Sequence, residues 1–215
     1  MKHIPKTAEP TAFTQWKIGE DPNWNPGWGE LDSSRTMKTL VKKALLDEQG
    51  NICCYCGIGL TDTDSHIEHF RPRHGVYAFP QGEIEYANLL ACCLPEKQDA
   101  AKNHCGMKKG AADPGQIVSP LDPTCEARFS YASNGEIEAH TKTDAIALNT
   151  ISKLGLDIAF LTKHRYEALE GAGLFDAAVT SAELTVMATQ LLQRNPDNTF
   201  TPFCFSTAYV LRNYV

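Results

Sequence analysis

Cys53-Cys54-Tyr55-Cys56 opens a block of metal-binding and acid–base residue types that continues with His66-Ile67-Glu68-His69-Phe70-Arg71-Pro72 and ends with Cys105-Gly106-Met107-Lys108-Lys109-Gly110. Asn88 and the adjacent pair Cys92-Cys93 lie between the last two segments. Two groups of cysteines therefore flank an acid and a histidine that are neighbours in the chain. The block indicates two kinds of site, one built on thiols and one on a carboxylate and an imidazole.

The cysteines have the spacing of a structural zinc site. A tetrahedral zinc ion takes four sulfur or nitrogen ligands, and a C-x-x-C turn supplies two thiolates from one short segment. Cys53 and Cys56 have this spacing, and Cys105 with either Cys92 or Cys93 would complete the four. A redox dithiol is the alternative for the first pair, but it needs a thioredoxin-like βαβ context that this sequence lacks. We therefore expect structural Zn²⁺.

The acid–histidine pair has the groups that phosphodiester hydrolysis needs. Glu68 offers a hard oxygen ligand for a divalent cation, and His69 offers a general base with an ordinary pKa of about 6.5. On a strand, residues 66 and 68 share a face while 69 points the other way. His66 is either a further metal ligand or a packed histidine that orients its neighbours. Asn88 is expected to hold the loop that positions the base, through hydrogen bonds to backbone groups.

Length and composition predict one main domain preceded by an arm. A chain of 215 residues with 42% apolar residues can form a single core. All three tryptophans (Trp16, Trp24 and Trp28) fall in residues 1–32, among prolines and glycines that predict an irregular arm. Their rings either lie on the protein's own core or dock onto a partner. Residues 33–215 are expected to form the domain, with the motif core at 53–110 and a hairpin and helices at 111–215.

Three local patterns predict secondary structure outside the motif block. Apolar residues from Met37 to Leu45 recur at helical spacing, between a candidate N-cap at Ser33 or Ser34 and a stop at Gly50. Asn134-Gly135 predicts a hairpin turn after Phe129-Ser130-Tyr131. From Asp144 onward the pattern is helical, with apolar stripes over residues 158–169 and 184–192, whereas the class of the apolar run 203–215 is ambiguous.

Charge and hydropathy bear on compartment and partners. The chain lacks an apolar run of about 18 residues and begins without a signal-peptide pattern, so we expect a cytoplasmic protein with no membrane contact. Six of the eight cysteines fall between positions 53 and 105, which favours metal ligation over disulfides. The net charge of −6 provides no overall basic footprint for nucleic acid. Either a local group holds the substrate (Arg71, Arg73, Lys102, Lys108 and Lys109), or a partner supplies the binding surface.

Taken together, these motifs resemble the HNH endonuclease family. The resemblance is carried by Cys-x-Tyr-Cys (Cys53 to Cys56), Ile-Glu-His-Phe-Arg-Pro (Ile67 to Pro72), Asn-Leu-Leu-x-x-Cys (Asn88 to Cys93) and Cys-Gly-x-x-Lys-Gly (Cys105 to Gly110), and it covers roughly residues 40–170. It is closest to the PtuB-type proteins of Septu and retron-associated anti-phage systems. The resemblance implies an α+β fold, with a ββα-metal (His-Me finger) core and a structural zinc site embedded in a mainly helical domain.

The resemblance also implies roles for individual residues. It makes His69 the general base, Glu68 a ligand of catalytic Mg²⁺ or Mn²⁺ and Asn88 the loop-holding residue, and it favours Cys93 over Cys92 in the zinc site. The chain departs from the family at Gly106, where many members have His or Asn as the second catalytic-metal ligand. His104 or Asn103, just upstream, could substitute for it.

The family context implies a function and a partner. PtuB-type proteins work with a PtuA-like ABC/SMC-type ATPase, so we expect such a partner and a nucleic-acid substrate, with DNA favoured. Cleavage of RNA, tRNA included, is an alternative, since nothing in the sequence distinguishes recognition of the 2′-hydroxyl. A second alternative is a non-catalytic, zinc-stapled module that binds nucleic acid or protein.

Overall fold

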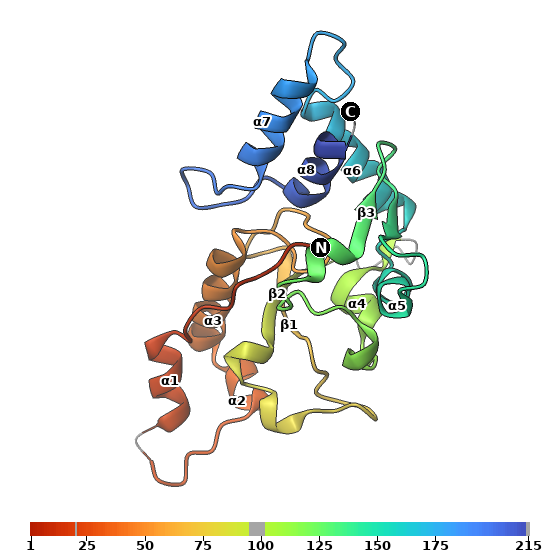
Figure 1. Cartoon of the computed structure of the whole chain (residues 1–215). Helices are drawn as coiled ribbons and strands as arrows, with labels where there is room; N and C mark the ends of the chain where they lie inside the picture. Colours follow the sequence, from red (N-terminus) through yellow and green to blue (C-terminus); the bar gives the residue numbers. More distant parts are fainter. Residues whose placement is uncertain (20, 95–101, 214–215) are drawn as a thin grey trace.

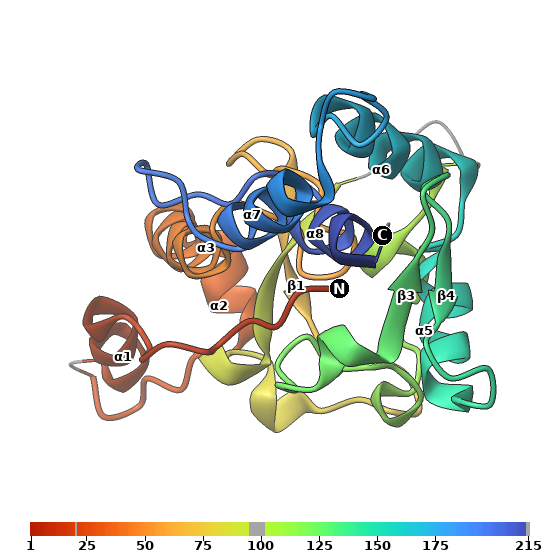
Figure 2. The same cartoon turned by 45° about the horizontal axis from the view of Figure 1, so that its top comes forward.

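The computed structural model describes residues 1–19, 21–94 and 102–213. In chain order the elements are α1 (Thr11–Ile18), α2 (Trp28–Ser33), α3 (Arg35–Gln49), β1 (Ser65–His69), η1 (Pro80–Gly82), η2 (Tyr86–Asn88), β2 (Leu89–Cys93), α4 (Cys105–Lys109), η4 (Pro114–Gln116), η5 (Cys125–Arg128), β3 (Phe129–Tyr131), β4 (Ile137–Ala139), α5 (Ala145–Leu154), α6 (Ala159–Gly171), α7 (Ser181–Leu191) and α8 (Cys204–Asn213). Helices α6, α7 and α8 gather at one end, α1 and α2 lie at the other, and β1 and β2 run between them (Figures 1 and 2).

Helix α3 delivers the chain to the first cysteines, as the sequence predicts. The Ser34 side chain accepts a hydrogen bond from the Met37 backbone N–H and so caps the first turn. Gly50 ends the helix in the left-handed conformation at φ 62°, which costs a glycine little. The buried side of the helix carries Val41 and Leu45, which lie in the main core.

Strands β1 and β2 form the antiparallel ladder that carries the candidate site. The register runs from Ser65 opposite Cys93 to His69 opposite Leu89. Every residue of β2 is buried, and α3 and α4 both contact this strand. The Gln49 side chain at the end of α3 pairs with both backbone groups of Ala91, at 2.7 and 2.8 Å. The order of two strands followed by α4 is compatible with the predicted ββα core.

The N-terminal segment differs from the irregular arm that the sequence predicts, because it contains α1 and α2. Pro10 precedes α1, and the fully buried Phe13 fixes that helix on the core. The Glu30 carboxylate accepts the Gly27 backbone N–H at 2.8 Å and caps α2. Trp28 packs against the main core, which agrees with the reading that the tryptophan rings lie on the protein's own surface grooves.

The predicted hairpin is β3–β4, with Tyr131 opposite Ile137. Gly135 in its turn has φ 84°, and a Cβ atom there would lie 2.2 Å from the Thr162 carbonyl oxygen, so the turn packs directly on α6. Helices α6, α7 and α8 enclose a second apolar cluster, and α8 resolves the ambiguous C-terminal run as helix. That cluster consists of Leu169, Leu174, Leu184, Ala188, Ala208, Val210 and Leu211.

In the part of the chain that the structure describes, no single helix has the length and apolar composition to cross a membrane. Helices α5 and α6 are long and apolar enough only when they are counted together, and a bend of 101° separates them.

Candidate active site and metal centre

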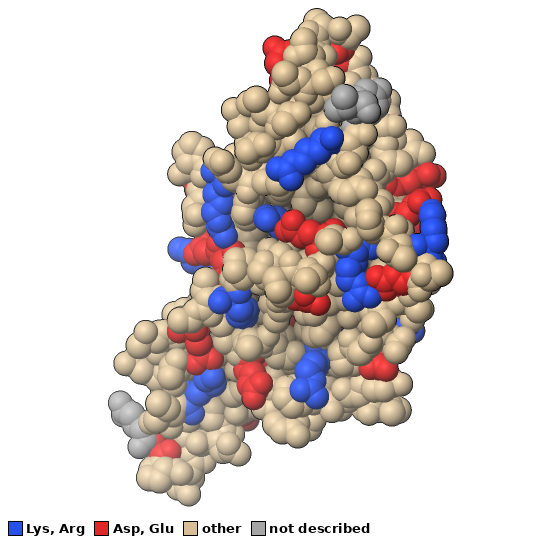
Figure 3. Space-filling view, in the orientation of Figure 1, with Lys and Arg blue, Asp and Glu red and all other residues tan. Residues whose placement is uncertain are grey.

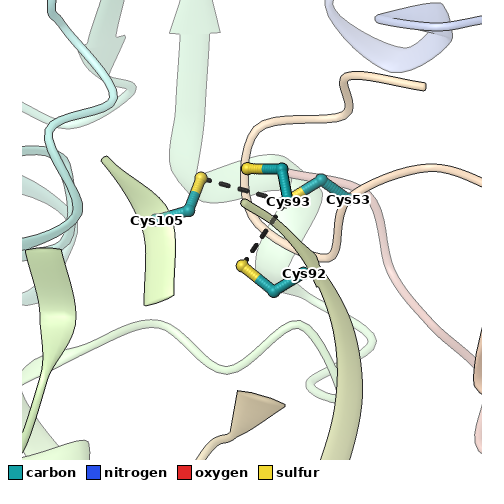
Figure 4. A group of neighbouring side chains, drawn as sticks. All are labelled: Cys53, Cys92, Cys93 and Cys105. Carbon is teal, nitrogen blue, oxygen red and sulfur yellow. Dashed lines mark hydrogen bonds between the residues drawn. The ribbon is translucent and has the colours of Figure 1, made fainter. Parts of the chain in front are cut away.

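Five cysteines from three segments of the chain lie close together: the turn after α3, the end of β2 and the start of α4. Cys53 and Cys56 lie in the turn after α3, Cys92 and Cys93 end β2, and Cys105 begins α4; all five are buried. The Cys53 Sγ atom lies 3.8 Å from the sulfurs of both Cys92 and Cys105, and Cys56 Sγ lies 3.9 Å from Cys93 Sγ. Figure 4 shows four of these thiols turned toward a common centre.

His104 belongs to the same cluster. Its Nε2 atom lies 3.4 Å from Cys93 Sγ, while Nδ1 lies 2.5 Å from the Lys102 carbonyl oxygen. The carbonyl can only accept, so Nδ1 carries the proton and Nε2 presents its lone pair to the thiols. The suggestion that His104 is the second catalytic-metal ligand beside Glu68 is therefore wrong, because the ring is turned into the thiol cluster.

Within the described residues, two overlapping sets of four donors meet the distance requirement of a metal site, each with all ligand atoms within 4.8 Å of one another. The first set is Cys53, Cys92, Cys93 and Cys105, and the second is Cys56, Cys93, His104 and Cys105. Thiolates and imidazole are the ligands that zinc prefers, so the donors fit a metal such as zinc. The predicted ligands Cys93 and Cys105 occur in both sets, whereas Cys53 occurs only in the first and Cys56 only in the second, so the predicted four do not form one of these sets. Cys92, the disfavoured alternative, is also a donor.

Glu68 is buried between a lysine, a tyrosine and a histidine. Its Oε1 atom lies 2.8 Å from Lys109 Nζ and accepts the Tyr55 hydroxyl at 3.2 Å, while Oε2 lies 3.5 Å from His66 Nε2. Burial alone would raise the pKa of Glu68, but His66 and the Lys109 charge outweigh it and hold that pKa below its usual value. The carboxylate is therefore ionised at neutral pH and presents Oε2 on the side of His66.

Gly106 lies directly against this carboxylate. A Cβ atom at Gly106 would lie 2.5 Å from Glu68 Oε2 and 3.0 Å from His66 Nε2. The departure from the family pattern thus has a steric reason, since a His or Asn side chain would occupy the space that Glu68 and His66 fill. His66, on the same face of β1 as Glu68, places an imidazole nitrogen there instead. Within the described ranges, His66 Nδ1 is a buried atom without a hydrogen-bond partner.

His69 is held in one tautomer and is largely buried. Its Nε2 atom lies 2.8 Å from the Glu83 carbonyl oxygen, so Nε2 carries the proton and Nδ1 carries the lone pair. The Trp28 ring covers it at a centroid distance of 4.5 Å, and only 7% of His69 is exposed. Burial, helped by the charge of Arg73, lowers the pKa of His69 to about 4, although the Glu83 hydrogen bond acts in the opposite direction. The ring is a neutral base at pH 7.

Asn88 makes the backbone hydrogen bonds that the sequence predicts for it. Its Oδ1 atom accepts the Arg71 N–H at 2.8 Å, and its Nδ2 group donates to the carbonyl oxygens of Arg71 and Gly82 at 3.1 and 3.0 Å. The two ends of the β1–β2 connection are thereby tied together. This connection carries Glu83, the residue that fixes the His69 tautomer.

No protein-family model matches the chain. It is similar to a protein of Vibrio cholerae serotype O1 biovar El Tor described as "Retron Vc95 putative HNH endonuclease", with 28% identity over 138 residues that cover 62% of this chain and 65% of the relative. This similarity supports the family resemblance and its retron context. The match spans less than two thirds of the relative.

The basic side chains near the candidate site fall into two groups. Arg71 is exposed and stacks on Phe79 at 3.5 Å, and the half-buried Arg73 lies over the Trp28 ring at 4.6 Å. Lys108 is exposed as well. The prediction that Lys109 contacts nucleic acid is wrong, because it is only 5% exposed and its Nζ atom bonds Glu68 and the His69 carbonyl oxygen.

Sequence reasoning missed Lys109, Tyr55, Trp28 and Glu83 as parts of the site. A signal existed for Lys109, since it lies four residues after Cys105 on α4 and therefore on the same helix face as a buried ligand. Tyr55 lies inside the C-x-x-C turn, but nothing in that spacing indicates where its ring points. Trp28 and Glu83 reach His69 only through tertiary packing.

Proposed function

We propose that this chain is a metal-dependent endonuclease that hydrolyses phosphodiester bonds of nucleic acid. The observation that carries the proposal is the end of β1, where an ionised Glu68 and a neutral, tautomer-fixed His69 follow each other in the strand, directly before a connection that Asn88 ties together. A carboxylate for a divalent cation and a base with a free lone pair are the two groups that hydrolysis by water requires. The similarity to the retron-associated relative supports the same chemistry.

In this proposal His69 Nδ1 takes a proton from the attacking water. The water oxygen forms the new bond to phosphorus, the phosphorus–oxygen ester bond breaks, and the leaving oxygen acquires a proton from solvent. Glu68 Oε2 and His66 Nε2 would hold Mg²⁺ or Mn²⁺, which when bound supplies charge stabilisation to the phosphate. Lys109 keeps Glu68 ionised and in place.

Zinc in the thiol cluster has a structural role in the same proposal. It would join the turn after α3, the end of β2 and the start of α4, which are the three segments that position Tyr55, Glu68 and Lys109. Binding energy of this kind contributes to folding directly, because the ligands meet only in the folded chain. Cys53→Ser should therefore give poorly soluble protein, and pure folded protein without zinc would contradict this role.

We propose that this chain and a partner protein bind the nucleic-acid substrate together. Arg71, Arg73 and Lys108 would contact phosphates locally. On the face in Figure 3, Lys and Arg side chains alternate with Asp and Glu over the described residues. That surface supports weak binding alone, because non-specific affinity depends on phosphate neutralisation. We propose that a PtuA-like ABC/SMC-type ATPase supplies the remaining grip in an anti-phage system, with DNA as the favoured substrate and RNA or tRNA as the alternative.

Cleavage assays test the proposed activity. Plasmid DNA and total tRNA are incubated with Mg²⁺ or Mn²⁺, with and without the ATPase, and with wild type or His69→Ala. The variant is expected to lose about 10²- to 10⁴-fold in rate, as for other general bases. His74→Ala is the matched control, since His74 is exposed on the same connection. Equal activity of wild type and His69→Ala, or wild type inert on both substrates under every condition, refutes the proposal.

A further inference from the structure

The thiol cluster contains more ligands than one tetrahedral ion can use. A zinc ion takes four, whereas the two donor sets together bring five cysteines and one histidine. The sets overlap only in Cys93 and Cys105. Each set therefore has two ligands of its own, Cys53 with Cys92 in the first and Cys56 with His104 in the second.

The distances fit metal tetrahedra in both sets. Zinc–sulfur bonds of about 2.3 Å at tetrahedral angles place two sulfurs about 3.8 Å apart, and a sulfur and a nitrogen about 3.6 Å apart. In the first set Cys53 Sγ is 3.8 Å from the sulfurs of Cys92 and Cys105. In the second set Cys93 Sγ is 3.9 Å from Cys56 Sγ and 3.4 Å from His104 Nε2. At these pairs of atoms, both sets have distances close to those of a metal tetrahedron.

We propose that the cluster holds two zinc ions that share the thiolates of Cys93 and Cys105. Bridging thiolates let six ligands complete two tetrahedra, which accounts for the overlap of the sets.

Two local features support this use of the ligands. Cys105 has φ 53°, a left-handed conformation that is uncommon for a residue with a side chain, and it turns the shared sulfur into the centre of the cluster (Figure 4). The Gly106 backbone N–H donates to Cys92 Sγ at 3.4 Å, and the Lys102 carbonyl oxygen orients His104. Such outer hydrogen bonds fix metal ligands, and they are present on Cys92, which belongs to the first set alone, and on His104, which belongs to the second set alone.

The test is metal stoichiometry in the full chain, measured without reference to nuclease activity. Elemental analysis and native mass spectrometry are expected to give two zinc ions per wild-type chain. Cys92→Ser and His104→Ala each remove a ligand that belongs to only one set, so each variant should retain one zinc ion per chain. Cys125→Ser is the matched control, because Cys125 is buried outside the cluster with its sulfur 3.9 Å from the Pro120 carbonyl oxygen, and it should retain two.

Cobalt titration of the wild type keeps the proposal testable if the variants do not fold. Thiolate-to-cobalt absorption should saturate at two equivalents, and the electron paramagnetic resonance signal should fall as the second equivalent binds, because shared thiolates couple the two spins. Saturation at one equivalent, one zinc per chain, or iron in place of zinc overturns the proposal. A chain with one zinc that cuts nucleic acid refutes this inference alone, and a chain with two zincs that does not cut refutes only the proposed function.

Discussion

Replacing Lys109 with methionine tests how the candidate site is held together. The Lys109 ammonium is buried, 2.8 Å from Glu68 Oε1 and 2.8 Å from the His69 carbonyl oxygen. Methionine keeps most of the side-chain stem and removes the charge. The Glu68 carboxylate then stays buried with Tyr55 and His66 but without its cation.

The expected cost is large, because removing one partner of a buried ion pair leaves an uncompensated charge. Such changes lower the free energy of unfolding by about 3–5 kcal/mol, a large share of the about 5–15 kcal/mol that stabilises a typical protein. The pKa of Glu68 lies below its usual value in the wild type, so its contribution to stability is present above the ordinary carboxyl pKa of about 4.3 and is lost as pH falls through the lowered pKa. In the variant, burial is no longer opposed by Lys109 and the pKa rises. The loss in free energy of unfolding caused by Lys109→Met should therefore become smaller as pH falls.

Denaturant unfolding of zinc-loaded protein at pH 8 and pH 5.5 measures this cost. Lys108→Met is the matched control, because Lys108 is the exposed neighbour and its loss should change stability by no more than about 0.5 kcal/mol. Adding Glu68→Gln to Lys109→Met should recover much of the loss, since it removes the unpaired charge. The reasoning is refuted if Lys109→Met lies within about 1 kcal/mol of wild type, or if the effects of the two substitutions simply add.

Three further predictions concern the same site. Gly106→Ala should weaken Mn²⁺ binding, measured by calorimetry, because its Cβ would lie 2.5 Å from Glu68 Oε2; unchanged affinity contradicts the steric account. Asn88→Ala should lower the free energy of unfolding by about 3 kcal/mol, because it leaves several buried backbone groups unpaired, and a loss below about 1 kcal/mol in denaturant unfolding counts against this. The acid limb of kcat/KM should lie near pH 4, since His69 is protonated only as pH falls through its lowered pKa; a limb near pH 6.5 contradicts the lowered pKa of His69.

Local sequence signals predicted the elements that depend on neighbouring residues. The cap at Ser34 and the stop at Gly50 bound α3, and the β3–β4 hairpin forms around Gly135. These features follow from backbone conformation and hydrogen bonds within a few residues, so a short stretch of sequence is enough to predict them. The prediction of an irregular arm was wrong because the prolines and glycines of residues 1–32 flank α1 and α2, apart from Gly29, which α2 accommodates.

The errors at the site have a common cause. Lys109 was expected on the surface because lysine usually is, yet a buried carboxylate from β1 provides its partner. His104 was expected beside Glu68 because it lies two residues before Gly106 in sequence, yet its ring faces Cys93. Adjacent residues at the start of a helix point in different directions, and which neighbour each one meets depends on how the strands pack beneath that helix.

The sequence by itself indicated the resemblance to HNH endonucleases, and it predicted the α3 helix, the hairpin, and a thiol-rich and an acid–histidine motif, because each depends on short spacings along the chain. Only the tertiary structure decided that six donors meet in one cluster, that Glu68 is paired with Lys109, and that Trp28 covers His69. Those contacts join segments that are far apart in the chain. They depend on the antiparallel register of β1 and β2 and on the packing of α3 and α4 against it, and no spacing along the chain specifies that geometry.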